Sequence, residues 1–77
     1  MGLFGSGSKT VKMQYKLAIP YHPGMDRAID QIYSTKGIKG VVFEGLSAVE
    51  IEYDPSRLTP ADVDRLLDAG LDARRKS

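Results

Sequence analysis

The chain contains no cysteine, and this absence excludes disulfide bonds, thiolate zinc sites, iron–sulfur clusters and a thiol nucleophile. It also lacks a dominant sign of charge, because 11 Lys and Arg residues face 10 Asp and Glu residues and leave a formal net charge of +1. Such a balance gives no electrostatic indication of a nucleic-acid partner. No apolar run approaches the roughly 20 residues of a membrane span, and no secretory leader pattern is present, so the sequence predicts a cytoplasmic protein.

A length of 77 residues leaves room for one small domain and for no deep enzyme cleft. The first residues are rich in glycine and serine and have no hydrophobic period, so residues 1–10 are predicted to be a flexible lead-in to one domain over residues 11–77. His22 is the only histidine. Because the chain offers it neither a base partner nor an oxyanion site, we do not expect an enzyme.

The first half of the domain predicts one strand and one helix. Apolar and polar residues alternate from Val11 to Ile19, which indicates a half-buried strand that Pro20 ends. Beyond the next loop, apolar residues at helical spacing predict a helix that begins near Asp26 and ends at Gly37. The apolar stripe of this helix comprises Ala28, Ile29, Ile32 and Tyr33.

The second half predicts a hairpin, a second helix and a short last strand. Two strands, Val41–Phe43 and residues 48–53, flank the tight connection at residues 44–47. A capping hydroxyl and a proline, Thr59 and Pro60, predict the start of the second helix, and Gly70 is expected to stop it. The predicted buried stripe of this helix comprises Val63, Leu66, Leu67 and Leu71. Residues 71–77 suffice for a short fourth strand, which the charges at 74–76 would keep at a sheet edge.

This order of elements, β-α-β-β-α with a possible last β, predicts the α+β class and a ferredoxin-like sandwich. An antiparallel sheet would carry both helices on one face. Its other face would hold Lys12 and Lys16 beside Glu50 and Glu52, where opposite charges can pair across strands. That open face has no aromatic platform for bases, so we expect no single-stranded RNA partner.

Several short motifs follow one another in an order that is typical of one known family. They are the Gly24-Met25 loop, Gly40-Val41, Val49 to Pro55, Thr59 to Asp62 and Ala69 to Ala73. With these motifs the stretch from Val11 to Ala73 resembles the heavy-metal-associated domain, the module of copper chaperones and of the tails of metal-transporting P-type ATPases. The resemblance implies a ferredoxin-like fold and a metal ion bound on the loop before the first helix.

The same loop departs from the pattern of that family, whose metal is held by the two cysteines of a Met-x-Cys-x-x-Cys motif. If the comparison is anchored at Gly24-Met25, the cysteine positions fall on Arg27 and Asp30. If it is anchored at Gly40-Val41, they fall on Gly24 and Arg27. Neither alignment supplies a soft ligand, and Arg27 puts a cation where the metal would lie.

Two other side chains in the loop could still bind a metal. His22 offers an imidazole and Met25 a thioether, and together they form an incomplete ligand pair for a weakly bound copper ion. The alternative interpretation is that Met25 packs under the loop as part of the core while His22 is a surface residue. The sequence leaves both interpretations open.

Two functions are therefore expected. The first is a small domain related to metal-transport proteins, with a degenerate loop and at most weak metal binding through His22 and Met25. The alternative is a metal-independent protein-interaction or regulatory module on the same fold. Its protein partner would dock through the first helix, the loop and the edge strand Val41–Phe43.

Overall fold

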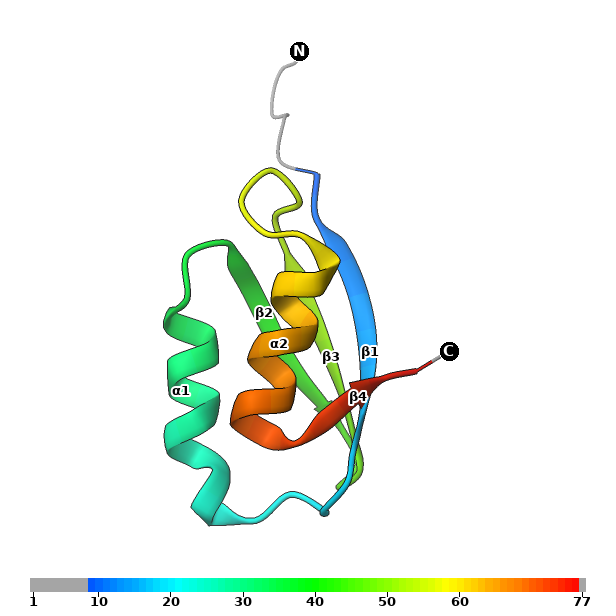
Figure 1. Cartoon of the computed structure of the whole chain (residues 1–77). Coiled ribbons are helices and arrows are strands. Elements are labelled where there is room, and N and C mark those ends of the chain that lie inside the picture. The colour runs from blue at the N-terminus through cyan, green and yellow to red at the C-terminus, as the bar shows by residue number, and fades with distance from the viewer. Residues whose placement is uncertain (1–8, 77) are drawn as a thin grey trace.

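The structure is a computed structural model that describes residues 9–76, so most of the predicted lead-in lies outside the described residues. Its elements follow one another as β1 (Val11–Leu17), the 3₁₀ turn η2 (Pro23–Met25), α1 (Asp26–Ser34), β2 (Ile38–Glu44), β3 (Ala48–Tyr53), α2 (Pro60–Leu71) and β4 (Ala73–Arg75) (Figure 1). The strands form one sheet in the order β2-β3-β1-β4, with every neighbouring pair antiparallel. The predicted α+β class and the predicted fourth strand are confirmed. No helix within residues 9–76 is long and apolar enough to cross a membrane.

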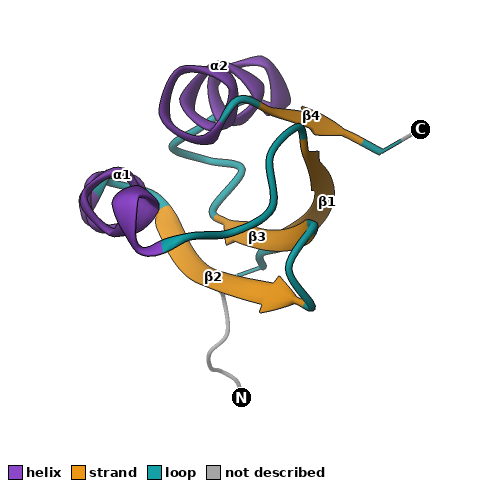
Figure 2. Ribbon diagram, turned by 90° about the horizontal axis from the view of Figure 1, so that it is seen from below, coloured by secondary structure: helices purple, strands orange, loops and turns teal. Residues whose placement is uncertain are grey.

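Both helices cover the same face of the sheet, and the sheet curves around them (Figure 2). The alternation of β1 and β3 places every second side chain of these strands under the helices. α1 contributes Ile32 to the core, and α2 contributes three residues at helical spacing. The side chains buried almost completely in this layer are Tyr15, Val49, Ile51, Tyr53, Val63 and Leu67.

The start of α2 follows from its local sequence, as predicted. The Thr59 hydroxyl accepts from the Asp62 backbone N–H at 3.1 Å, and the Asp62 carboxylate accepts from the Thr59 N–H at 3.0 Å. Pro60 occupies the first turn, where its missing N–H is not needed. These two hydrogen bonds form a capping box, and the one that the Asp62 carboxylate accepts from the Thr59 N–H lowers the pKa of that carboxyl.

The predicted end of α2 is wrong, because the helix continues through Gly70 to Leu71. Asp72 ends it by adopting a left-handed conformation with φ 52°. Gly70 faces α1 instead, and a Cβ atom on it would lie 3.3 Å from Cδ1 of Ile32. Gly70 therefore allows the two helices to approach closely.

The predicted first strand is also too long. β1 ends at Leu17, because the chain then leaves the sheet and binds the turn between β2 and β3: the Leu17 N–H donates to the Ser47 carbonyl at 2.8 Å. As a result Ile19 is 54% exposed instead of buried. Tyr33, which we expected on the buried stripe of α1, is 56% exposed because it lies at the outer side of that helix.

The open face of the sheet carries the predicted charges but not the predicted pairs. Lys12 lies directly opposite Glu52, whereas Lys16 lies opposite Ala48. No ion pair joins these lysines to a glutamate among residues 9–76. Glu52 instead accepts a hydrogen bond from the Thr10 hydroxyl.

Candidate functional site

The loop before α1 places the two predicted metal ligands on opposite sides of the chain. His22 is exposed and caps η2, because its Nδ1 accepts from the Gly24 backbone N–H at 3.1 Å. A Cβ atom on Gly24 would lie 2.7 Å from the imidazole ring, so the bare glycine makes this close cap possible. Met25 ends the turn, is only 8% exposed and belongs to the core.

This arrangement limits what the loop can offer a metal ion. Since His22 Nδ1 accepts from Gly24, the neutral ring carries its proton on Nε2, and binding a metal through Nε2 would require that proton to leave or to move to Nδ1. The Met25 thioether would have to leave the core in order to reach the surface. Within residues 9–76 no group of three or more histidine and carboxylate side chains converges on one point. Metal binding through His22 and Met25 stays a prediction.

Beside this loop lies an apolar surface that we name the loop–hairpin patch: Ile19, Tyr21, Phe43 and Leu46. The Tyr21 N–H donates to the Leu46 carbonyl at 2.7 Å and so fastens the loop to the β2–β3 turn. The rings of Tyr21 and Phe43 pack edge to face, with centroids 5.2 Å apart. In the chain segments next to this half-buried pair, Ile19 is 54% and Leu46 63% exposed. An apolar surface of this kind, built on a fixed aromatic base, is typical of a contact site.

A carboxylate borders the patch. The Tyr21 hydroxyl donates to Asp26 at 2.7 Å, and this hydrogen bond to a carboxylate raises the pKa of Tyr21. Glu44 ends β2, is exposed and belongs to the face of the sheet opposite to that of Phe43. The border of the patch is therefore negative where Tyr21 meets the start of α1.

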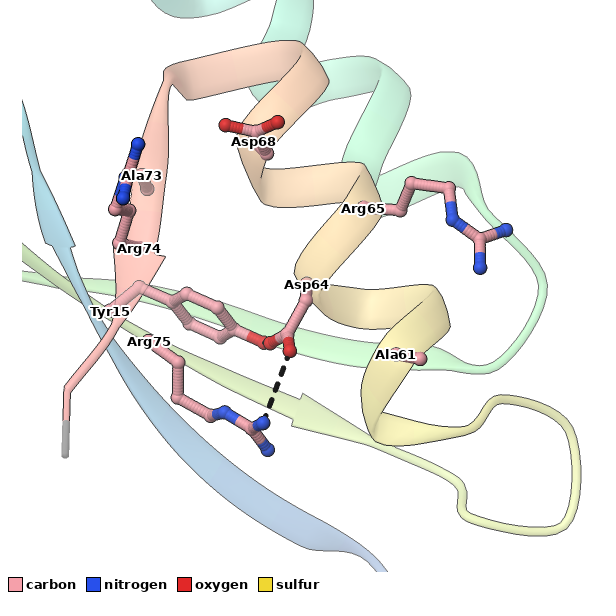
Figure 3. A pocket seen from close by; sticks show the side chains of 8 residues that line it. All are labelled: Tyr15, Ala61, Asp64, Arg65, Asp68, Ala73, Arg74 and Arg75. Carbon is pink, nitrogen blue, oxygen red and sulfur yellow. Dashed lines mark hydrogen bonds and ion pairs between the residues drawn. The ribbon is translucent and has the colours of Figure 1, made fainter.

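A second, polar site joins three elements at the other helix (Figure 3). Tyr15 of β1 is fully buried, and its hydroxyl donates to Oδ1 of Asp64 on α2 at 2.6 Å. Arg75 of β4 lies 3.2 Å from Oδ2 of the same carboxylate and 3.6 Å from the sulfur of Met13. Tyr15, Asp64 and Arg75 line an open cavity of about 480 Å³. The other residues that border this cavity are Ala61, Arg65, Asp68, Ala73 and Arg74.

The role of this second site is structural: its contacts hold β1, α2 and β4 together. Burial and the hydrogen bond to Asp64 raise the pKa of Tyr15 well above its ordinary value, so the phenol stays neutral. Both oxygens of Asp64 are occupied, one by the phenol and the other by the guanidinium. Sequence analysis missed this group. The one available signal was Tyr15 on the buried side of a strand, since a buried tyrosine hydroxyl usually finds a partner.

Searches against known protein families, curated proteins and solved structures found no match for this chain. The resemblance to the heavy-metal-associated domain therefore stays a prediction. Function has to be argued from the loop, the loop–hairpin patch and the edges of the sheet.

Proposed function

We propose that this chain is a ferredoxin-like domain of the heavy-metal-associated type that acts as a metal-independent, non-catalytic protein-interaction module. Its partner would dock on the loop, the start of α1 and the β2 side of the sheet. The observation that carries the proposal is the exposure of Ile19 and Leu46 next to the packed rings of Tyr21 and Phe43. The strand order β2-β3-β1-β4, with both helices on one face, supports the ferredoxin-like part of the proposal.

The partner that fits the loop–hairpin patch presents an apolar side chain with a basic residue beside it. The apolar group would cover Ile19 and Leu46, and burial of such residues is the usual source of binding energy at an interface. The cation would face Asp26 at the border, where opposite charges favour one orientation of the partner. The partner is therefore a protein segment of mixed apolar and basic character.

Weak copper binding through His22 and Met25 is the competing function, and it makes a different demand on the molecule. The thioether would have to be withdrawn from a nearly closed core position, and the imidazole could bind through Nε2 only by moving its proton to Nδ1 and giving up the hydrogen bond from the Gly24 N–H. A domain with a single small core has little stability to spare for such a change. This cost supports the metal-independent function.

Titration with Cu(I), and separately with Zn(II), under anaerobic conditions decides between the two functions. We expect the amide NMR shifts of residues 21–27 to stay constant up to millimolar metal. Saturable shifts centred on His22 and Met25 that disappear in His22→Ala would overturn the metal-independent proposal.

The interaction itself is tested with a displayed library of random peptides selected on the wild-type domain. We expect the selected peptides to be apolar and basic and to shift the amides around Ile19 and Leu46. Leu46→Asp should weaken their binding about tenfold or more, since it places a charge in the centre of the contact. Tyr33→Asp, a change at a similarly exposed residue on α1, is the matched control and should leave binding unchanged. Selected peptides that bind Leu46→Asp as well as the wild type would exclude the patch.

A further inference from the structure

The two edge strands of the sheet differ in how they are protected from pairing with a further strand. β4 forms one edge with three residues, Ala73–Arg75, two of which are arginines. β2 forms the other edge with seven residues and, among the described strands, pairs with β3 alone (Figure 2). An unpaired strand edge offers backbone N–H and carbonyl groups to any other strand, and proteins usually block it with charges, prolines or irregular geometry.

On β2 these blocking features lie only at the ends of the strand. A register shift between Ile38 and Gly40 makes Lys39 an extra, unpaired residue at one end, and Glu44 lies at the other. The segment between them, Gly40–Phe43, has neither a charge nor a proline. Val42 in its middle is 56% exposed on the open face. The centre of β2 is thus left without the features that prevent pairing.

We propose that two copies of this chain pair along β2, antiparallel and about a two-fold axis at Val42, to make one continuous sheet of eight strands. This inference deepens the proposed function by naming one partner of the edge strand, a second copy of the chain. It uses an edge that adjoins the loop–hairpin patch and shares Phe43 with it.

The register follows from the symmetry and from the pattern of β2. A two-fold axis perpendicular to the sheet keeps each face on its own side, so residues that lie opposite one another must point to the same face. With the axis at Val42, this residue meets its own symmetry mate on the open face. On the helix face the half-buried Val41 meets the half-buried Phe43 of the second copy. Glu44 meets Gly40, where no side chain obstructs it.

Neighbouring registers are poorer. An axis at Val41 would place Phe43 opposite the cation Lys39. An axis at Phe43 would place Val42 opposite Glu44 and Val41 opposite the turn residue Gly45. The axis at Val42 alone brings apolar residues together on both faces, and such cross-strand pairs are the unit of sheet stabilisation. About five residue pairs would join, so we expect a weak dimer that forms at high protein concentration.

The test places charges on the axis, where each residue meets only its own counterpart. In Val42→Lys two lysines would face one another, and in Val42→Glu two glutamates would. We expect sedimentation velocity to show a concentration-dependent dimer of the wild type. Each variant alone should associate at least about tenfold more weakly than the wild type. An equimolar mixture of the two variants should associate again as a heterodimer, which native mass spectrometry identifies by mass.

Tyr33→Lys is the matched control at an equally exposed residue away from the edge, and it should dimerise like the wild type. Thermal melts followed by circular dichroism verify that each variant is folded. A wild type that stays monomeric at millimolar concentration overturns the proposal, as does a Val42→Lys variant that still dimerises or a mixture that forms no heterodimer. Peptide binding is read out separately through Leu46→Asp: a chain that stays monomeric but binds its peptides through Leu46 loses this inference and keeps the proposed function, so the two failures are distinguishable.

Discussion

Tyr15 connects the hydrophobic core to the polar group at α2. Its ring belongs to the core, and its hydroxyl donates a hydrogen bond to the carboxylate of Asp64, which also forms an ion pair with Arg75. One side chain from β1 thereby holds α2 and the short strand β4 in place. β4 has only three residues, and this group adds a side-chain contact to its backbone pairing with β1.

We predict that Tyr15→Phe lowers the free energy of unfolding by about 1.5 to 3 kcal/mol, the usual cost of losing a hydrogen bond to a charged group. The ring stays, so the core remains filled and the fold is kept. Urea denaturation of the two proteins at pH 7 measures the difference. Retention of the full wild-type stability would mean that the hydrogen bond contributes nothing.

The same pair of proteins also tests the raised pKa of Tyr15. The folded state holds the phenolic proton more tightly than the unfolded state, whose tyrosine titrates near pH 10. The advantage of wild type over Tyr15→Phe is therefore complete below pH 10 and decreases as the pH rises above it. A difference in unfolding free energy that stays constant between pH 9 and pH 11 would contradict this assignment.

Among the connecting elements, two glycine turns differ in the space around them. Gly37, between α1 and β2, has φ 101°, and a Cβ atom there would lie 3.0 Å from side-chain atoms of Arg57 and Leu58. Gly45, in the β2–β3 turn, has φ 70° and no atom within 4 Å of such a Cβ. The first turn therefore combines backbone strain with crowding, while the second has strain alone.

We predict that Gly45→Ala costs about 1 kcal/mol of unfolding free energy and that Gly37→Ala costs at least about 2 kcal/mol. Chemical denaturation of both variants beside the wild type gives the two values. The Gly45 variant is the internal control, because it carries the backbone penalty without the contact. Equal losses in the two variants would show that the neighbours of Gly37 move aside freely.

Local chemistry explains which parts of the elements could be predicted. The start of α2 was correct because Thr59, Pro60 and Asp62 form their capping contacts within one turn of chain. Its end was wrong because a glycine near a helix terminus indicates either a stop or a close contact, and only the position of Ile32 in space separates the two for Gly70. The end of β1 at Leu17 likewise depends on the distant Ser47 carbonyl.

For the whole molecule, the candidate sites were less predictable than the fold. The hydropathy pattern alone indicated the order of elements and, in β1, the buried Tyr15 and Leu17, but it also predicted burial of Val11, which is 38% exposed. The partner of Tyr15 is 49 residues away in the sequence, and no local pattern selects Asp64 over the other aspartates of α2. The outcome for Met25 depended on whether its side chain turns toward the core, which the closure of the loop on the β2–β3 turn determines.

Two adjacent leucines of α2 test whether the single core carries the stability of the whole domain. Leu67 is fully buried, whereas Leu66 is half-buried and borders the surface groove between the helices. A chain of this length is expected to be stable by roughly 4 to 12 kcal/mol. Leu67→Asp loses the packing of a leucine, about 2 to 5 kcal/mol, and adds the cost of burying a carboxylate. We therefore predict that Leu67→Asp is unfolded at 25 °C, as judged by circular dichroism and amide NMR dispersion.

Leu66→Asp is the matched control, since it makes the same chemical change one residue away. Its carboxylate can turn into the groove and stay hydrated, so the variant should remain folded with a cooperative melt at reduced temperature. This expectation corrects the sequence pattern, which placed Leu66 and Leu67 on one buried stripe. Unfolding of both variants would show that the groove closes in solution and that Leu66 belongs to the core. Survival of Leu67→Asp would show that α2 contributes little to the stability of the sheet.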